Sequence, residues 1–124
     1  MDILIADDSR TILALTYHVL EQLGHTVQTV RDGDEVITLL WALPPPDLLI
    51  TDYNMPRMDG LEVLRRIRAN DRFKLLRVIV YTTNEYPEFK SEVERLGGVL
   101  VKKVISELVA AVNAIAAEIS KERG

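Results

Sequence analysis

Acidic, hydroxyl and basic side chains follow four short apolar segments of this chain, each at the point where the segment ends. These side chains are Asp7, Asp8, Asp52, Thr82 and Lys102. Three carboxylates that lie close together repel one another, so a cation is needed to stabilise them, and Mg²⁺ prefers carboxylate, water and phosphate oxygens. A hydroxyl and an ammonium group beside them suit a phosphoryl group, whose charge they would stabilise. These residues therefore predict a Mg²⁺-dependent phosphoryl site with an aspartate as acceptor.

Each of these residues also has an ordinary structural explanation. Strands end where solvent begins, and Asp8 or Ser9 could simply cap a helix. Thr82 is β-branched and could simply be a strand residue without a functional role, while Lys102 could be a solvated residue at a strand end. Five such residues at the ends of four apolar segments favour a shared site over coincidence.

The elements that must bring these residues together alternate along the chain. The expected strands cover residues 3–6, 25–30, 48–51, 78–81 and 99–101. The expected helices cover 9–23, 34–43, 61–70, a segment that starts at 87, and 106–121, with Ser9 as the first N-cap, Gly24 after the first helix and Pro44–Pro46 ending the second. Strands that alternate with helices predict an α/β fold with a parallel sheet covered on both faces. Ligands of such folds bind at the carboxyl ends of the strands, where the polar residues follow.

Composition narrows the function classes. The chain has 124 residues, a net charge of −4 and no cysteine. This size predicts one domain over residues 1–124, and the lack of cysteine excludes disulfides and thiolate metal sites. The acidic balance argues against a nucleic-acid surface, and the absence of a long apolar run argues against a membrane span, so we expect a cytoplasmic protein.

The stretch from Asp52 to Gly60 carries the most specific pattern in the chain. It reads D-x-x-M-P-x-M-D-G after an apolar strand, with the Asp7–Asp8 pair upstream and Thr82 and Lys102 downstream. Together these residues resemble the receiver domain of two-component response regulators, over essentially the whole chain. The resemblance implies a flavodoxin-like (βα)5 doubly wound fold with five parallel strands in the order 2-1-3-4-5.

The resemblance also implies a role for each site residue. Asp52 would accept a phosphoryl group from a histidine kinase or a small phosphodonor. Mg²⁺ would be held by Asp7, Asp8 and Asp52 together with the backbone carbonyl of Asn54. Thr82 and Lys102 would bind oxygens of the transferred group, and Asn54 and Asn84 would flank the water that removes it. Such a protein is a phosphoacceptor with slow self-catalysed gain and loss of the phosphoryl group, and not a dedicated enzyme.

The sequence departs from the family pattern on the output side. The family has proline after the strand-five lysine, and here Lys103 follows, so we expect a trans peptide bond because a cis bond without proline is costly. Two adjacent lysines leave open which one reaches the phosphoryl group, and we favour Lys102 from its place at the strand end. Val99 stands where the family carries an aromatic switch residue, and Tyr86 is a candidate to replace that ring.

Two functions from different classes fit these residues. The first is a phosphorylation-dependent switch whose partners are a sensor histidine kinase or phosphotransfer protein and a downstream protein, with a possible homodimer through the fourth helix, fifth strand and fifth helix. The second is a receiver-like interaction module that works without phosphorylation, which Val99 and Lys103 favour. A phosphatase with an aspartate nucleophile fits less well, because Asn54 stands where that class carries a second acid.

Overall fold

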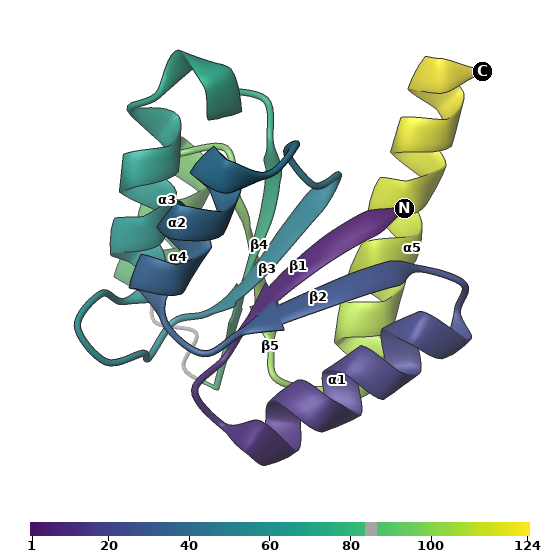
Figure 1. The fold of residues 1–124 in the computed structure, drawn as a ribbon, viewed down its shortest axis with the longest axis horizontal. Helices are drawn as coiled ribbons and strands as arrows, with labels where there is room; N and C mark the ends of the chain where they lie inside the picture. The colour runs from purple at the N-terminus through teal and green to yellow at the C-terminus, as the bar shows by residue number, and fades with distance from the viewer. Residues whose placement is uncertain (84–86) are drawn as a thin grey trace.

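The computed structural model describes residues 1–83 and 87–124 and shows a five-stranded parallel sheet between two layers of helices (Figure 1). The elements are β1 (Asp2–Ala6), α1 (Arg10–Gln22), β2 (Thr26–Val30), α2 (Gly33–Ala42), β3 (Leu48–Asp52), α3 (Gly60–Arg68), the 3₁₀ turn η1 (Asp71–Phe73), β4 (Arg77–Thr82), α4 (Pro87–Arg95), β5 (Val99–Lys102) and α5 (Ile105–Arg123). The strand order is β2-β1-β3-β4-β5, so the expected fold and strand order are confirmed.

The two faces of the sheet are covered by different helices, as Figure 1 shows. Helices α1 and α5 cover one face, and α2, α3 and α4 cover the other. Alternate residues of each strand enter the two cores, so that Ile3 and Ile5 pack beneath α1 and α5 while Leu4 packs beneath the other three helices. Both faces are buried, which explains the continuous apolar runs of the central strands.

Local signals place the helix ends close to where the sequence predicts them. The Ser9 hydroxyl accepts a hydrogen bond from the N–H of Ile12, and Asp59 caps α3 in the same way by accepting from Glu62. Gly24 follows α1 with a φ of +93°, a left-handed conformation that favours glycine. The three prolines end α2 at Ala42, and α4 begins at Pro87 as expected.

The structure adds one short element to those expected and moves several element ends by one or two residues. The turn η1 was not expected; its N-cap is Asn70, whose side chain accepts from the N–H of Arg72. Strand β5 extends to Lys102, one residue beyond the expected end, because Lys102 pairs with Thr82 of β4. Across the part of the chain that the structure describes, no helix is long and apolar enough to cross a membrane.

Candidate functional site

Three carboxylates meet at the carboxyl ends of β1 and β3, which are neighbours in the sheet. One side-chain oxygen from each of Asp7, Asp8 and Asp52 lies within 4.8 Å of the other two. Asp7 is 2% exposed and Asp52 is 5% exposed, whereas Asp8 faces solvent. The cluster thus has a buried base and an open side, and it joins residues that are 45 positions apart in the chain because β1 and β3 run parallel.

The backbone around the buried carboxylates is arranged to hold them. The N–H of Ser9 donates to Asp7 Oδ1 at 2.9 Å, and the N–H of Asn54 donates to Asp52 Oδ1 at 3.3 Å. Gly60 lies directly against the backbone of Asp52, where a Cβ atom would lie 2.4 Å from the Asp52 carbonyl oxygen. Only glycine allows this approach, so Gly60 lets α3 begin beside the acidic cluster.

The surroundings of Asp52 change the pKa of its carboxyl group. Burial and the nearby charge of Asp7 raise the pKa of Asp52 from 3.8 to about 6, against the opposing effect of Lys103. Burial by itself would lower the pKa of Lys103, but its hydrogen bonds to Asp7 and Asp52 outweigh burial and raise it. At neutral pH the site therefore holds an ionised Asp52 beside a charged lysine.

The lysine in the site is Lys103, and our expectation of Lys102 at this place was wrong. Lys103 Nζ lies 3.0 Å from Asp7 Oδ2 and 3.0 Å from Asp52 Oδ1, and its side chain is 13% exposed. The Lys102 side chain is exposed to solvent. The peptide bond between the two lysines is trans, as expected.

The alternation of side chains along the strands explains this choice of lysine. Asp7, Asp52 and Lys103 each come two residues after a strand residue that packs beneath α1 and α5. Those strand residues are Ile5, Ile50 and Val101. Because side chains alternate between the two faces of a sheet, Lys103 leaves β5 on the same face as the two aspartates, and Lys102 leaves it on the other.

Thr82 ends β4 beside the cluster and is buried, 1% exposed. Its carbonyl oxygen accepts a 2.8 Å hydrogen bond from the N–H of Lys103, which ties the end of β4 to the segment that follows β5. The N–H of Val104 then donates to the carbonyl of Lys102 at 2.7 Å, so the chain turns sharply at Lys103. Asn84 and Tyr86, which the resemblance implicated, lie outside the described residues.

The aromatic contacts near the site were not predicted from the sequence. Tyr53, the residue after Asp52, stacks on Phe89 of α4 with ring centroids 4.5 Å apart. Tyr81 lies in the core beneath α1 and α5, and Lys103 Nζ lies 5.7 Å from its ring centroid. Val99 is 46% exposed on β5 and brings no ring to the site. The strand alternation places Tyr81 on the face of Asp52, a signal that the sequence contains.

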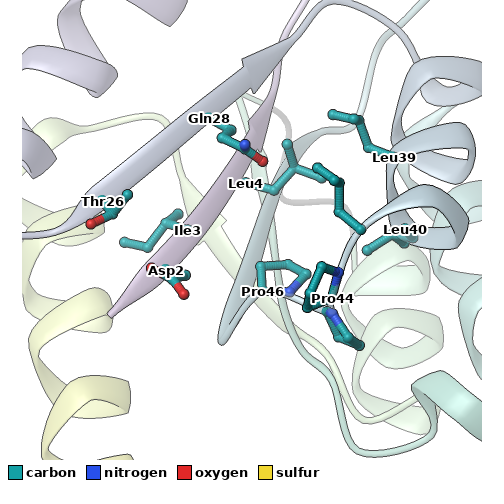
Figure 2. A pocket seen from close by; sticks show the side chains of 11 residues that line it. Asp2, Ile3, Leu4, Thr26, Gln28, Leu39, Leu40, Pro44 and Pro46 are labelled. Carbon is teal, nitrogen blue, oxygen red and sulfur yellow. The ribbon is translucent and has the colours of Figure 1, made fainter.

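One hollow of the described surface lies away from this cluster. It has a volume of about 320 Å³ and is bordered by the amino ends of β1 and β2, the end of α2 and Pro44–Pro46 (Figure 2). Asp2 is the one titratable residue among those that line it. The chemistry-bearing residues therefore gather at the opposite ends of the strands, where the acidic cluster is open to solvent.

Comparison with known proteins assigns the family. The sequence profile of the response regulator receiver domain matches residues 3–113. The chain belongs to this family. Receiver domains are signalling switches of two-component systems and are generally not enzymes; they bind Mg²⁺ at an acidic pocket, and CheY-like members interact with histidine kinases or phosphotransfer proteins and with downstream targets.

Individual relatives agree with this assignment. The receiver domain is 38% identical to chemotaxis protein CheY1 of Helicobacter pylori over 84 residues, which covers 67% of this chain and 68% of that protein. It superposes on the receiver domain of Francisella response regulator 1452 with a TM-score of 0.85 at 26% identity, covering 95% and 98% of the two chains. It also superposes on the Mn²⁺-bound form of response regulator Rcp1 with a TM-score of 0.77 at 27% identity, covering 92% and 90%.

Proposed function

We propose that this receiver domain is a phosphorylation-dependent switch in which Asp52 accepts a phosphoryl group from a phosphohistidine of a sensor kinase or phosphotransfer protein. The observation that carries the proposal is the cluster itself, in which three carboxylate oxygens lie within 4.8 Å of one another and a lysine ammonium contacts the two buried ones. Burying several charged groups together lowers the stability of the fold. A cluster of this kind is therefore more typical of a functional site than of a purely structural one.

Asp52 has the chemistry of an acceptor. The contacts from Lys103 and from the N–H of Asn54 both fall on Oδ1, so we take Oδ2 as the attacking atom. Oδ2 forms a new O–P bond while the N–P bond of the donor phosphohistidine breaks, and the departing imidazole keeps the electron pair and takes a proton from solvent. A pKa of about 6 leaves Asp52 ionised, and therefore nucleophilic, at neutral pH.

The acidic cluster fits a magnesium ion. Asp7, Asp8 and Asp52 supply the hard oxygen donors that Mg²⁺ prefers, the carbonyl of Asn54 is the further ligand that the family resemblance implies, and the exposed side at Asp8 leaves room for water and phosphate. The bound ion would neutralise charge on the transferring phosphoryl oxygens. The Mn²⁺-bound form of the related regulator Rcp1 supports a divalent cation site in this fold.

Magnesium should stabilise the fold through this cluster. Adding Mg²⁺ at about ten times its dissociation constant should raise the free energy of unfolding by about 1.4 kcal/mol, because the ion binds the folded state only. Asp8→Ala should greatly reduce this gain, while Asp71→Ala, which removes an exposed acid outside the cluster, should leave it unchanged. Urea unfolding with and without Mg²⁺ measures the effect, and equal gains in the Asp8 and Asp71 variants would argue against the magnesium site.

After transfer, two residues would hold the phosphoryl group. Lys103 already lies 3.0 Å from Asp52 Oδ1, so we assign to Lys103, in place of Lys102, the pairing with a phosphoryl oxygen. Thr82, buried at the end of the adjacent strand β4, is our candidate for a hydrogen bond to a second oxygen. The same Mg²⁺ site and a water molecule would slowly return Asp52 to its free form.

The output of the switch would be a change in partner binding through the face formed by α4, β5 and α5. The stack of Tyr53 on Phe89 connects the acceptor loop to α4 and supports this face as the responding one. No comparison supports the homodimer that we considered.

We extend the receiver domain to residues 1–124. Ile115 and Ile119 lie beyond the profile match, but they pack in the core beneath α1 and α5. We place the protein with its kinase in the cytoplasm.

Incubation with phosphoramidate and Mg²⁺, followed by intact-mass spectrometry, tests the proposal. The wild-type chain should gain the mass of one phosphoryl group, and Asp52→Asn should not. Asp47→Asn removes a carboxylate that hydrogen-bonds to the N–H of Asp2 and should gain the group normally. A wild-type chain that is folded but never gains the mass would instead favour the phosphorylation-independent interaction module.

A further inference from the structure

Tyr81 is a buried aromatic residue directly beside the phosphoryl site. It precedes Thr82 at the end of β4, is 5% exposed, and pairs in register with Asp52 of β3 on one side and Val101 of β5 on the other. Its side chain belongs to the core beneath α1 and α5, the same face on which Lys103 leaves β5. The ring therefore lies where it can contact the lysine that reaches the cluster.

The ammonium group of Lys103 is held from two directions. It donates to Asp7 Oδ2 at 3.0 Å and forms an ion pair with Asp52 Oδ1, also at 3.0 Å. The Tyr81 ring lies beside it, with 5.7 Å between Nζ and the ring centroid, which is within the range of a cation–π contact. Because an ammonium carries three N–H groups, the two carboxylate contacts leave one donor for an incoming phosphoryl oxygen.

The long side chain of Lys103 needs contacts along its length to hold the ammonium group in one place. Its stem has four methylene groups with many rotamers, and ordering them costs entropy. The backbone hydrogen bond from Lys103 to Thr82 orients only the start of the side chain, so the far end must be fixed by what surrounds it. An aromatic face repels neither the charge nor the apolar stem, and it occupies space into which the ammonium could otherwise turn.

We propose that Tyr81 is a positioning residue of the phosphoryl site. Its ring holds the Lys103 ammonium against Asp7 and Asp52, so that the cation is already in place when the phosphoryl group arrives. This proposal rests on the function proposed above. It concerns Lys103, which contacts the aspartates in place of Lys102, and names Tyr81 as the residue that orients its ammonium group.

Two substitutions at Tyr81 separate the ring from the hydroxyl. Tyr81→Leu should lower the rate of phosphorylation by phosphoramidate at saturating Mg²⁺ by about three- to tenfold, a range that corresponds to loss of one partly desolvated cation–π contact. Tyr81→Phe keeps the ring and should restore the rate to within about twofold of the wild type. A Phe variant as slow as the Leu variant, or a Leu variant as fast as the wild type, would overturn the proposal.

A double-mutant comparison tests whether Tyr81 acts through Lys103. In a Lys103→Met background, Tyr81→Leu should have no further effect on the phosphorylation rate, because the group that the ring positions is gone. A residue that only fills the core would slow the reaction in both backgrounds, and that result would contradict the proposal.

Nuclear magnetic resonance of the wild-type protein keeps the test independent of how the Leu variant folds. The ε-methylene protons of Lys103 should be shifted upfield by the Tyr81 ring, relative to those of the exposed Lys102, with Lys103→Arg used for assignment. Equal shifts for the two lysines would overturn the contact. The shift does not depend on phosphorylation, so a wild-type chain with the shift but no phosphoryl mass would reject the proposed function and leave the Tyr81 contact standing.

Discussion

Replacing Asp52 with asparagine should stabilise the protein, raising the free energy of unfolding at about pH 7.5 by about 2–3 kcal/mol. Burial and Asp7 raise the pKa of Asp52 from 3.8 to about 6, so ionising this carboxyl is harder in the folded state than in the unfolded one. The asparagine has the same size and no charge, so the cost disappears.

The sign of the effect fixes its pH dependence. Well below pH 3.8 Asp52 is protonated in both states, so the variant and the wild type should be equally stable. Between the unfolded pKa and about 6 the unfolded state releases the proton first, so the wild type loses stability as the pH rises, and above this range the full difference is present. Urea unfolding across this pH range measures it.

Asp47 provides a control with the opposite sign. Burial acts to raise the pKa of Asp47, but the N–H of Asp2 and the Arg123 guanidinium outweigh burial and lower it. Its charged form therefore stabilises the fold above the unfolded pKa, and Asp47→Asn should lower stability at neutral pH. If Asp52→Asn also lowered stability at neutral pH, the ionised carboxylate of Asp52 would not destabilise the fold, contrary to our prediction.

Lys103→Met should lower both the stability of the fold and the rate of phosphorylation. Without the ammonium, Asp7 and Asp52 repel each other with no cation between them, and we expect stability at neutral pH to fall by about 1–3 kcal/mol. The rate of phosphorylation by phosphoramidate should fall by at least about tenfold, because a donor to the phosphoryl oxygens is lost.

The adjacent lysine is the matched control. Lys102→Met removes an exposed ammonium, so stability should change by less than about 0.5 kcal/mol and the phosphorylation rate should stay near that of the wild type. Urea unfolding and intact-mass time courses on both variants measure the contrast. If Lys102→Met lowered stability and the phosphorylation rate while Lys103→Met did not, Lys102 would be the lysine of the site, as the sequence predicted.

The fold and the acidic part of the site follow from the sequence for a simple reason. Each central strand is an apolar run that is buried on both faces, and each ends where a polar residue begins. Parallel strands put those ends at one edge, so the sequence alone predicts that Asp7, Asp8 and Asp52 lie together. The strand order came from the family resemblance and was confirmed.

The choice of lysine could not be made from strand ends alone. We placed the end of β5 at Val101, which made Lys102 the first residue at the rim, but pairing with Thr82 carries the strand one residue further. Once Lys102 is part of the strand, alternation sends it away from the aspartates and brings Lys103 to them. The contact of Lys103 with Tyr81 depends in addition on the register between β4 and β5, which the sequence pattern does not determine.

Asp52 is the proposed phosphoryl acceptor of this receiver domain. The most direct measurement is to treat the wild-type protein with phosphoramidate and Mg²⁺, reduce it with borohydride, and map the peptides by mass spectrometry, since borohydride reduces an aspartyl phosphate to homoserine. We predict homoserine at position 52 and an unmodified aspartate at Asp7 and Asp8. Homoserine at either of those positions, or phosphoryl mass that stays on a residue other than Asp52, would show that Asp52 is not the acceptor.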